Sequence, residues 1–430
     1  MHYKVSSLIY YLKRYYQNSP YFGFVRGHDY LEEKKLKLIS DKIGNVSNDI
    51  IDDFEKLFSL NIGDGESVSF GAGRMGFYSL MKVLDIGEGD DVILPGHTCS
   101  VMPNAVIRTG ANPIFSDIDP DTFGSSAIEI EKVITNKTKL IVAQHSFGIP
   151  CDIHPIVELA KLKNIFLVED CAITFGSRIN NIPVGNFGDA ALFSLDHTKP
   201  INTFLGGLIY SKDKELYDKL KEVQNSSSNF SVYRQKVTWK KLLFEQKYYN
   251  PMNYSKSFLM NKYNQLFYSQ KNAYLMDDYG RSEGFNYPYP AKLPTFLALL
   301  GIYELGNWKF EKNKRKNLLL EFLSRSSDLG ITEFLPKSYF DKTLDIVPLR
   351  FIYRHPNASV IRKKMSKYID INLFWFLKPI ITCSDPRNLG YIFNSCPISE
   401  IIGKEIINWP CIFSEFDNER LLKYYNIVHS

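Results

Sequence analysis

The sequence predicts an α/β fold in which a large domain with a mainly parallel sheet is joined to a smaller C-terminal α/β domain. Two observations support this prediction. Between residues 66 and 211, short apolar segments alternate with segments of helical periodicity, a pattern typical of a parallel sheet covered by helices on both faces. After residue 284, a long helical stretch is followed by a shorter set of strand and helix segments, which indicates the second unit.

The elements of the large domain can be assigned in order along the chain. We expect the strands to be short apolar runs, namely ESVSF (66–70), DVILP (91–95), NPIFSDI (112–118), KLIVAQH (139–145), IFLVED (165–170), ALFSL (191–195) and GGLIYS (206–211). We expect the helices between them to be GRMGFYSLMKVL (73–84), MPNAVIRTG (102–110), AIEIEKVI (127–134) and IHPIVELAKLKN (153–164). This order predicts a large domain core over residues 66–211.

Three further segments flank this core. Residues 1–65 are predicted to be an N-terminal helical segment, because IIDDFEKLFSL places apolar residues at helical spacing. Residues 212–283 are rich in aromatic and basic residues, and we interpret them as a helical insertion. A packed lid or a subunit contact is the favoured role of the insertion, and contact with a lipid-linked or polymeric partner is the alternative. Residues 284–430 are predicted to form the small C-terminal domain.

Composition excludes several classes of protein. The chain has 430 residues, of which 44% are hydrophobic and 23% are charged, so it is not a disordered protein. Its 52 Lys and Arg against 47 Asp and Glu give a net charge of +5, which does not indicate a nucleic-acid binder. No apolar run approaches the roughly 18–20 residues of a membrane span. The first apolar patch is broken by Lys13 and Arg14, so we expect no signal peptide and a cytoplasmic location.

The cysteines do not indicate a metal site. None of the six forms a CxxC pair, and no HExxH motif is present. In a chain of this size they are interpreted as reduced, mostly buried thiols of a cytosolic protein. We therefore predict no metal.

A glycine motif stands between the first predicted strand and the first predicted helix. Residues Gly71 to Gly76 match the pattern GxGxxG. A dinucleotide site would need an acidic residue at the carboxyl end of the second strand. Asp90 and Asp91 stand at the entrance of that strand instead, where they cannot reach a ribose. The pattern therefore favours a helix N-terminus that binds a single phosphate.

Three side chains follow on later elements of the same sheet. Asp170 ends a predicted strand, Ser194 lies near the end of another, and Lys199 follows five residues later. Because ligands of α/β folds bind at the carboxyl edge of the sheet, these groups are expected near the phosphate site. A lysine amine, a carboxylate and a hydroxyl are what pyridoxal phosphate requires for its aldehyde, ring nitrogen and phosphate.

From about residue 50 to residue 220, the sequence resembles the DegT/StrS-type aminotransferases, which use pyridoxal phosphate and have fold type I. GAGRMGFYSL corresponds to the family turn SGTxAL, and IGEGDDVILP to GxGxGDEVIxP. AVIRTGANPIFSDIDPDTF corresponds to AVxxxGAxPVFxDIDPxTF, and QHSFG to VHxxG. LVEDCAI corresponds to VIEDAAQ, and GDAALFSLDHTK to GDxxxFSFxxxK. A fainter similarity continues after residue 284 in GFNYP and ISEIIGKEIINWP.

The resemblance implies a role for each matching residue. Lys199 would bond to the cofactor aldehyde and then carry the proton between the substrate and the cofactor. Asp170 would pair with the pyridinium nitrogen. Ser194 would hold the phosphate together with the backbone N–H groups of Arg74 and Met75, and the Arg74 side chain either adds a cation there or faces solvent.

The resemblance also implies a homodimer with shared active sites, because Asn286 corresponds to an asparagine that reaches the phosphate of the neighbouring subunit. Several positions depart from the family pattern. Ile173 replaces a glutamine, and Pro288 replaces an arginine. Cys99 stands where an aromatic ring often stacks on the cofactor, and either His97 takes over that contact or it is a structural turn residue.

The resemblance implies an aminotransferase that aminates a nucleotide-linked keto-sugar, with glutamate as donor, in surface-polysaccharide or other amino-sugar biosynthesis. Three alternatives remain open: a dehydratase or decarboxylase, a non-sugar aminotransferase, and a non-catalytic sensor or scaffold. Dehydration is kept open by His197, since related sugar dehydratases have a histidine in place of the lysine. His145 is equally consistent with lining the site and with a satisfied core position.

Overall fold

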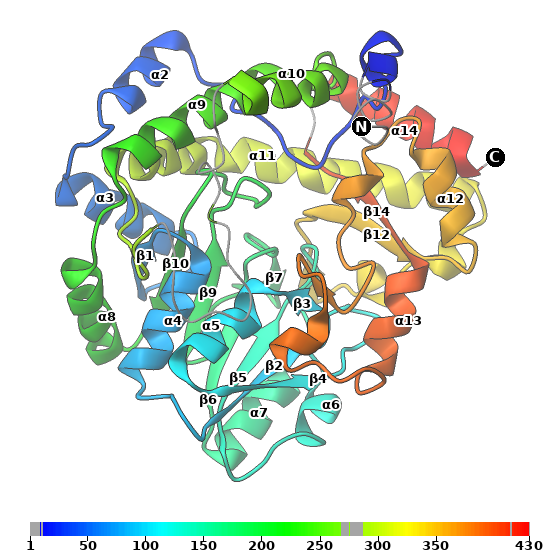
Figure 1. Ribbon diagram of the computed structural model, residues 1–430. Coiled ribbons are helices and arrows are strands. Elements are labelled where there is room, and N and C mark those ends of the chain that lie inside the picture. The colour runs from blue at the N-terminus through cyan, green and yellow to red at the C-terminus, as the bar shows by residue number, and fades with distance from the viewer. Residues whose placement is uncertain (1–8, 10–11, 268–274, 276–286, 413–414, 430) are drawn as a thin grey trace.

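A seven-stranded sheet forms the centre of the large domain. The computed structural model describes residues 9, 12–267, 275, 287–412 and 415–429. The strand order is β1-β10-β9-β6-β5-β2-β4, in which β1 and β10 are antiparallel to their neighbours and the other pairs are parallel (Figure 1). The strands are β1 (Glu66–Phe70), β2 (Asp91–Pro95), β4 (Asn112–Ser116), β5 (Thr138–Gln144), β6 (Phe166–Asp170), β9 (Ala190–Ser194) and β10 (Gly207–Ser211). The predicted α/β class with a mainly parallel sheet is confirmed.

Helices bury both faces of this sheet. Alternate residues of β5 enter different cores: Leu140 and Val142 join one core, and Ile141 joins the other. Burial on both faces explains why the strands are continuous apolar runs in the sequence. The helices of the large domain and of the segment before it are α2 (Glu33–Ser40), α3 (Asn48–Ser59), α4 (Gly73–Val83), α5 (Val101–Thr109), α6 (Ala127–Glu131) and α7 (Ile153–Lys163).

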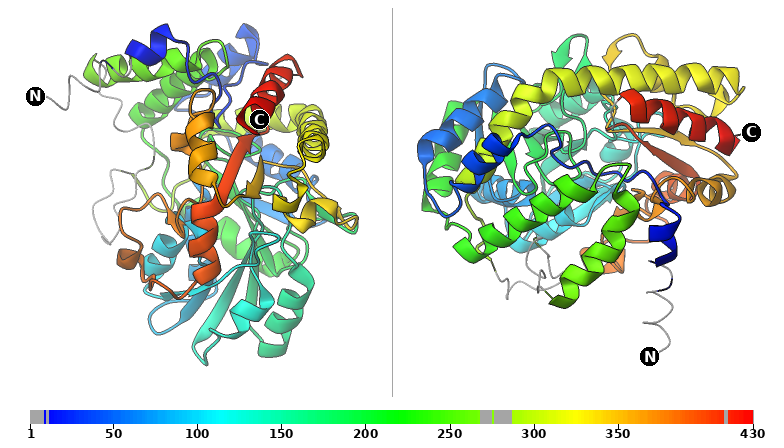
Figure 2. Two further views of the ribbon diagram at one scale, coloured as in Figure 1. Left: turned by 90° about the vertical axis from the view of Figure 1, so that its right-hand side faces the viewer. Right: turned by 90° about the horizontal axis from the view of Figure 1, so that it is seen from above.

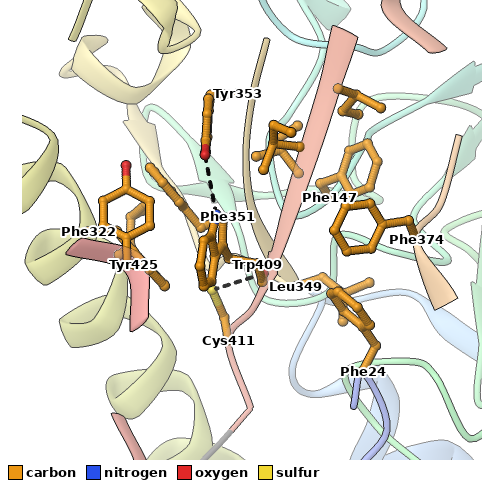
Figure 3. Close-up of a cluster of buried hydrophobic side chains, with 14 of the residues drawn as sticks. Phe24, Phe147, Phe322, Leu349, Phe351, Tyr353, Phe374, Trp409, Cys411 and Tyr425 are labelled. Carbon is orange, nitrogen blue, oxygen red and sulfur yellow. Dashed lines mark hydrogen bonds between the residues drawn. The ribbon is translucent and has the colours of Figure 1, made fainter. Parts of the chain in front are cut away.

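The C-terminal part is built on a two-stranded antiparallel ribbon. Strands β12 (Arg350–Arg354) and β14 (Ile406–Pro410) pair along their whole length. Aromatic side chains pack on both sides of the ribbon, with Phe322 and Tyr425 on one side and Phe24 and Phe374 on the other (Figure 3). The helices beside it are α12 (Ala358–Met365), α13 (Pro397–Glu405) and α14 (Glu415–His429).

Helix α11 (Thr295–Asp328) connects the two parts, because it packs on α3 near its start and on α14 near its end (Figure 2). A short parallel pair makes a second connection, in which β13 (Ile380–Ile381) lies beside β3 (Thr98–Cys99). The remaining short strands are β7 (Arg178–Ile179), β8 (Ile182–Pro183) and β11 (Leu344–Asp345). These connections bring residues near 375 close to the edge of the large sheet.

The predicted insertion contains α8 (Lys214–Ser226), α9 (Val232–Tyr248) and α10 (Tyr254–Phe267). Helix α9 packs on the N-terminal arm, residues 20–30: the Gln246 amide donates to the His28 carbonyl. A Cβ on Gly27 would lie 2.4 Å from the Glu245 carbonyl oxygen, so only glycine allows this approach. Within the described part of the chain, no helix is long and apolar enough to cross a membrane.

Candidate active site

The turn between β1 and α4 brings a helix N-terminus against the carboxyl edge of the sheet. Ala72 forms a parallel bridge with Gly206, and α4 then begins at Gly73. A Cβ on Gly207 would lie 2.3 Å from the backbone N and Cα of Gly73, so glycine is required at position 207. A Cβ on Gly73 would likewise lie 3.5 Å from the Cβ of Ser194. The first turn of α4 and the Ser194 hydroxyl therefore form one polar corner, suited to an anion.

Arg74 and Met75 occupy the next two positions of α4. The backbone N–H of Met75 donates to the Ala72 carbonyl at 3.0 Å. The Arg74 guanidinium donates to the Leu275 carbonyl at 2.8 Å, and the Arg74 carbonyl accepts a bond from the Tyr289 hydroxyl. The Arg74 side chain thus contacts the segment that leads into the small domain.

Asp170 is the last residue of β6 and is 4% exposed. Its Oδ1 atom accepts the backbone N–H of Ala172 at 2.9 Å. Burial raises the pKa of the Asp170 carboxyl, while this N–H bond and the charge of Lys199 act in the opposite direction. The carboxylate therefore lies within electrostatic reach of the lysine and lacks the hydration that an exposed aspartate has.

Lys199 lies in a tight turn after β9. Its backbone N–H donates to the Asp196 carbonyl at 2.9 Å, and the Asp196 carboxylate accepts the N–H and hydroxyl of Thr198. The Lys199 Nζ atom lies 4.7 Å from the ring centroid of Trp375, so the amine faces the small domain. A cavity of about 40 Å³ adjoins the lysine and is lined in part by the N-terminal arm.

The positions that depart from the family pattern have defined surroundings. Cys99 is half-buried, and its Sγ atom lies 3.4 Å from the Thr382 hydroxyl. The buried His97 ring lies 4.1 Å from the Phe376 ring, and burial lowers the pKa of His97 to about 4. Ile173 is part of the hydrophobic core shared with the small domain. The predicted site residue Asn286 lies outside the described residues.

His145 belongs to a buried polar network. Its Nδ1 atom accepts the backbone N–H of Cys151 at 3.0 Å, and its Nε2 atom lies 3.0 Å from the Glu169 carboxylate. Glu169 also accepts the backbone N–H groups of Gly185, Phe187 and Gly188. The two bonds fix a neutral imidazole with its proton on Nε2. Glu169 thereby anchors the loop before β9, which leads to Ser194 and Lys199.

The same network contains the group of potential metal ligands found within the described residues. His145, Glu169 and Cys171 have ligand atoms within 4.8 Å of one another, and all three side chains are buried. Both ring nitrogens and both carboxylate oxygens already have protein partners, so a metal would have to displace several hydrogen bonds. The network is therefore explained as a structural one.

The polar corner, together with Asp170 and Lys199, fits a pyridoxal phosphate group. That group needs a lysine amine for its aldehyde, an anion beside its ring nitrogen and donors for its phosphate. Lys199, Asp170, Ser194 and the start of α4 offer these chemical types from four neighbouring elements at one edge of the sheet. The donor set contains one cation and one anion close enough to interact, which matches a ligand that carries both charges.

Three residues near Lys199 were missed by sequence reasoning. The Trp375 ring lies against both the Lys199 amine and the Arg350 guanidinium, and Phe24 of the N-terminal arm lies beside Arg350. No motif or periodicity marks these positions. Each of these positions is more than 150 residues from Lys199 along the chain, and a single sequence gives no signal for such contacts.

Comparisons with known proteins agree with this geometry. A sequence model described as the DegT/DnrJ/EryC1/StrS aminotransferase family matches residues 38–423. A GDP-perosamine synthase of Escherichia coli O157:H7 is 40% identical over 185 residues, which cover 43% of this chain and 50% of that protein. A dTDP-4-dehydro-2,3,6-trideoxy-D-glucose 4-aminotransferase of Saccharopolyspora spinosa is 35% identical over 165 residues, 38% of this chain and 43% of that protein.

These sequence matches span about half the length of the curated relatives. A solved structure extends the likeness in fold over nearly the whole chain. It is a putative sugar aminotransferase from Streptococcus pneumoniae in its PMP form, with a TM-score of 0.69 and 18% identity, and the match covers 93% of this chain and 97% of that one.

Proposed function

Because the chain belongs to the DegT/DnrJ/EryC1/StrS aminotransferase family, we propose that it is a pyridoxal phosphate-dependent aminotransferase acting on a nucleotide-linked keto-sugar. Glutamate is the expected amino donor, and surface-polysaccharide or other amino-sugar biosynthesis is the expected setting. The names of the two curated relatives, a GDP-perosamine synthase and a dTDP-sugar 4-aminotransferase, support this substrate class.

The observation that carries the proposal is the electrostatic interaction of the buried Asp170 carboxylate with the half-buried Lys199 amine. When bound, pyridoxal phosphate supplies an electron sink for the carbon that gives up its proton. Asp170 would hold the proton on the ring nitrogen, and its burial would strengthen the effect of that carboxylate on the ring. Lys199 Nζ would hold the aldehyde end of the group and would carry the proton to and from the substrate carbon. Ser194 Oγ and the first N–H groups of α4 would bind the phosphate.

Transamination is favoured over dehydration by the contacts of His197. The dehydration alternative needs a histidine in place of the lysine as the base. Nδ1 of His197 lies 2.8 Å from the Glu245 carboxylate on α9, so this ring is engaged by the insertion. Lys199 remains the proposed base, and its charge acts to lower the pKa of the Asp170 carboxyl. A cytoplasmic homodimer completes the proposal, in which Asn286 of each subunit serves the site of the other.

Absorbance spectra of the purified protein test the proposal directly. We expect a visible cofactor band that converts to the shorter-wavelength pyridoxamine form when glutamate is added. Borohydride reduction before digestion should then leave a pyridoxyl adduct on the peptide that contains Lys199. Lys199→Ala should lose the adduct, whereas Lys212→Ala, which changes an exposed lysine after β10, should retain it.

Each proposed element has an outcome that would contradict it. An adduct on another lysine would overturn the assignment of Lys199. A cofactor band that no amino acid converts would favour a non-catalytic protein on the same fold. If glutamate converted the cofactor but no nucleotide-linked keto-sugar were turned over, the aminotransferase assignment would stand and the sugar substrate would be excluded. A monomeric mass in solution at assay concentration would exclude the shared site.

A further inference from the structure

Arg350 carries a buried charge that has no counter-ion among the residues that the structure describes. It begins strand β12 and is 2% exposed. Its Nη1 atom donates to the Leu373 carbonyl at 2.9 Å and to the Asn408 amide oxygen at 3.1 Å, and both acceptors are neutral. Among the described residues, no carboxylate lies within 4.0 Å of it. Burial therefore lowers the pKa of the Arg350 guanidinium well below its usual value.

A second arginine on the same strand has a carboxylate as its partner. Arg354 lies four residues further along β12 on the same face, since side chains alternate. Its guanidinium donates to the Glu405 carboxylate at 2.7 and 3.0 Å. An unpaired buried cation is costly to a folded protein. Arg350 is therefore the exception on this strand, and no carboxylate among the described residues supplies an anion for it.

In the described part of the chain, the hydrogen bonds of Arg350 engage only one side of its guanidinium. The guanidinium carbon lies 3.8 Å from the ring centroid of Trp375 and 4.1 Å from that of Phe24, so rings cover the group. The two acceptors at Nη1 account for the two hydrogens of that atom. The N–H groups of Nε and Nη2 have no hydrogen-bond partner among the described residues, and this edge of the guanidinium matches a carboxylate with two parallel bonds.

The distance from Arg350 to Lys199 fits an α-amino acid. Lys199 Nζ lies 4.7 Å from the centroid of the same Trp375 ring. Because both distances are measured to the same ring centroid, their sum is the largest possible separation of Lys199 Nζ and Arg350 Cζ, about 8.5 Å. An α-amino group, its Cα, its carboxylate and the bidentate contact to an arginine carbon together span about 7 Å. A single amino acid can therefore place its amine beside Lys199 Nζ and its carboxylate at the arginine.

We propose that Arg350 binds the α-carboxylate of the amino-acid donor, and that Trp375 forms the wall between this carboxylate subsite and Lys199. The inference rests on the proposed function, and it adds the residue that distinguishes an amino acid from a plain amine. The pyrophosphate of a nucleotide sugar is another anion in the reaction. It lies further from the reacting carbon than an α-carboxylate does, so the short distance to Lys199 favours the donor.

The test compares glutamate with 4-aminobutyrate, which differs from it only by the α-carboxylate. In the wild-type holoenzyme, we expect glutamate to convert the cofactor to the pyridoxamine form at least 10-fold more efficiently than 4-aminobutyrate. Arg350→Gln should remove most of that preference by slowing the reaction of glutamate alone. Arg354→Gln is the matched control on the same strand, and it should leave the preference unchanged.

Calorimetric titration gives a readout that does not depend on turnover. Glutarate should bind the wild-type holoenzyme and lose at least 10-fold in affinity in Arg350→Gln, while the affinity for GDP stays the same. Loss of GDP affinity with unchanged glutarate affinity would show that Arg350 binds phosphate and would overturn the inference. Equal rates of the wild-type enzyme with glutamate and 4-aminobutyrate would also overturn it, even where the variant does not fold. A holoenzyme that no amine converts would instead contradict the proposed function.

Discussion

The Oε1 atom of Glu245 lies 2.8 Å from Nδ1 of His197, and this ion pair joins the insertion to the turn that carries Lys199. Glu245 comes from α9 and its side chain is fully buried. Burial lowers the pKa of His197, but the charges of Glu245 and Asp196 outweigh burial and raise it to about 9 from 6.5. Near neutral pH the histidine is therefore a cation held by the insertion, two residues before the lysine.

Replacing Glu245 by Gln should make stability less dependent on pH. The neutral amide keeps a hydrogen-bond acceptor for His197 but removes the charge that raises the histidine pKa. Stability from a raised pKa is fully present below pH 6.5 and is lost as the pH rises through about 9. We expect the variant to lose on the order of 2–3 kcal/mol of unfolding free energy near pH 6, and much less near pH 10. Denaturant titrations at both pH values measure the difference.

Asp218→Asn is the control for the Glu245 variant. It removes a carboxylate from the same insertion, where Asp218 forms an exposed pair with Lys214. Exposed pairs contribute little to stability, so the two pH values should give the same result for this variant. A Glu245→Gln protein with an unchanged pH profile would show that the pair does not stabilise the turn.

Asp170→Asn should slow the reaction without lowering the melting temperature. Burial raises the pKa of Asp170, so the ionised carboxylate is unfavourable in the folded protein at pH 8. The asparagine retains an oxygen for the Ala172 N–H and removes that charge. We expect the cofactor-free variant to melt at the same temperature as the wild type or higher, while the glutamate half-reaction slows about 100-fold or more. Thermal unfolding and stopped-flow absorbance test the two parts, and a half-reaction at the wild-type rate would exclude Asp170 as the partner of the ring nitrogen.

The sequence predicted the elements that carry the proposed site better than the contacts around it. The strands that end at Asp170 and Ser194 could be predicted, because burial on both faces of a parallel sheet leaves a local apolar pattern. The approach of Trp375 to Lys199 could not, because it depends on the pairing of β13 with β3 and on where α11 places the small domain. Glu245 was likewise hidden in an insertion whose helices have no counterpart in the motifs. Local patterns report burial, whereas the partners of a buried charge are set by tertiary contacts.

Gly207→Ala should weaken both the fold and the binding of the cofactor. The added Cβ would meet the backbone of Gly73 at 2.3 Å, and backbone atoms of a helix start cannot move aside as a flexible side chain can. We expect a loss of about 2 kcal/mol or more in unfolding free energy. Because the helix start must shift away from Ser194, the dissociation constant of pyridoxal phosphate should rise at least 10-fold.

The control for Gly207 is Gly306→Ala in helix α11, where an added Cβ meets no atom of the described residues within 4 Å. Alanine is favoured over glycine in a helix by about 1 kcal/mol, so this variant should be slightly more stable and bind the cofactor normally. Urea unfolding and equilibrium titration of the cofactor measure both effects. Normal cofactor affinity in Gly207→Ala would contradict the placement of the phosphate at the start of α4.

Trp375→Leu should impair the use of glutamate more than Trp375→Phe does. The indole ring lies over both the Lys199 amine and the Arg350 guanidinium, and each contact of a cation with an aromatic face contributes about 0.5–2 kcal/mol. Phenylalanine keeps an aromatic face, whereas leucine removes it and leaves both cations to find other neighbours. We expect a rise of about 5- to 20-fold in the glutamate concentration for half-maximal conversion with leucine, and a smaller rise with phenylalanine. Trp239→Leu, which changes a ring packed on Phe296 outside the site, should leave that concentration unchanged. If leucine and phenylalanine at position 375 gave the same values as tryptophan, the ring would not form part of the donor subsite.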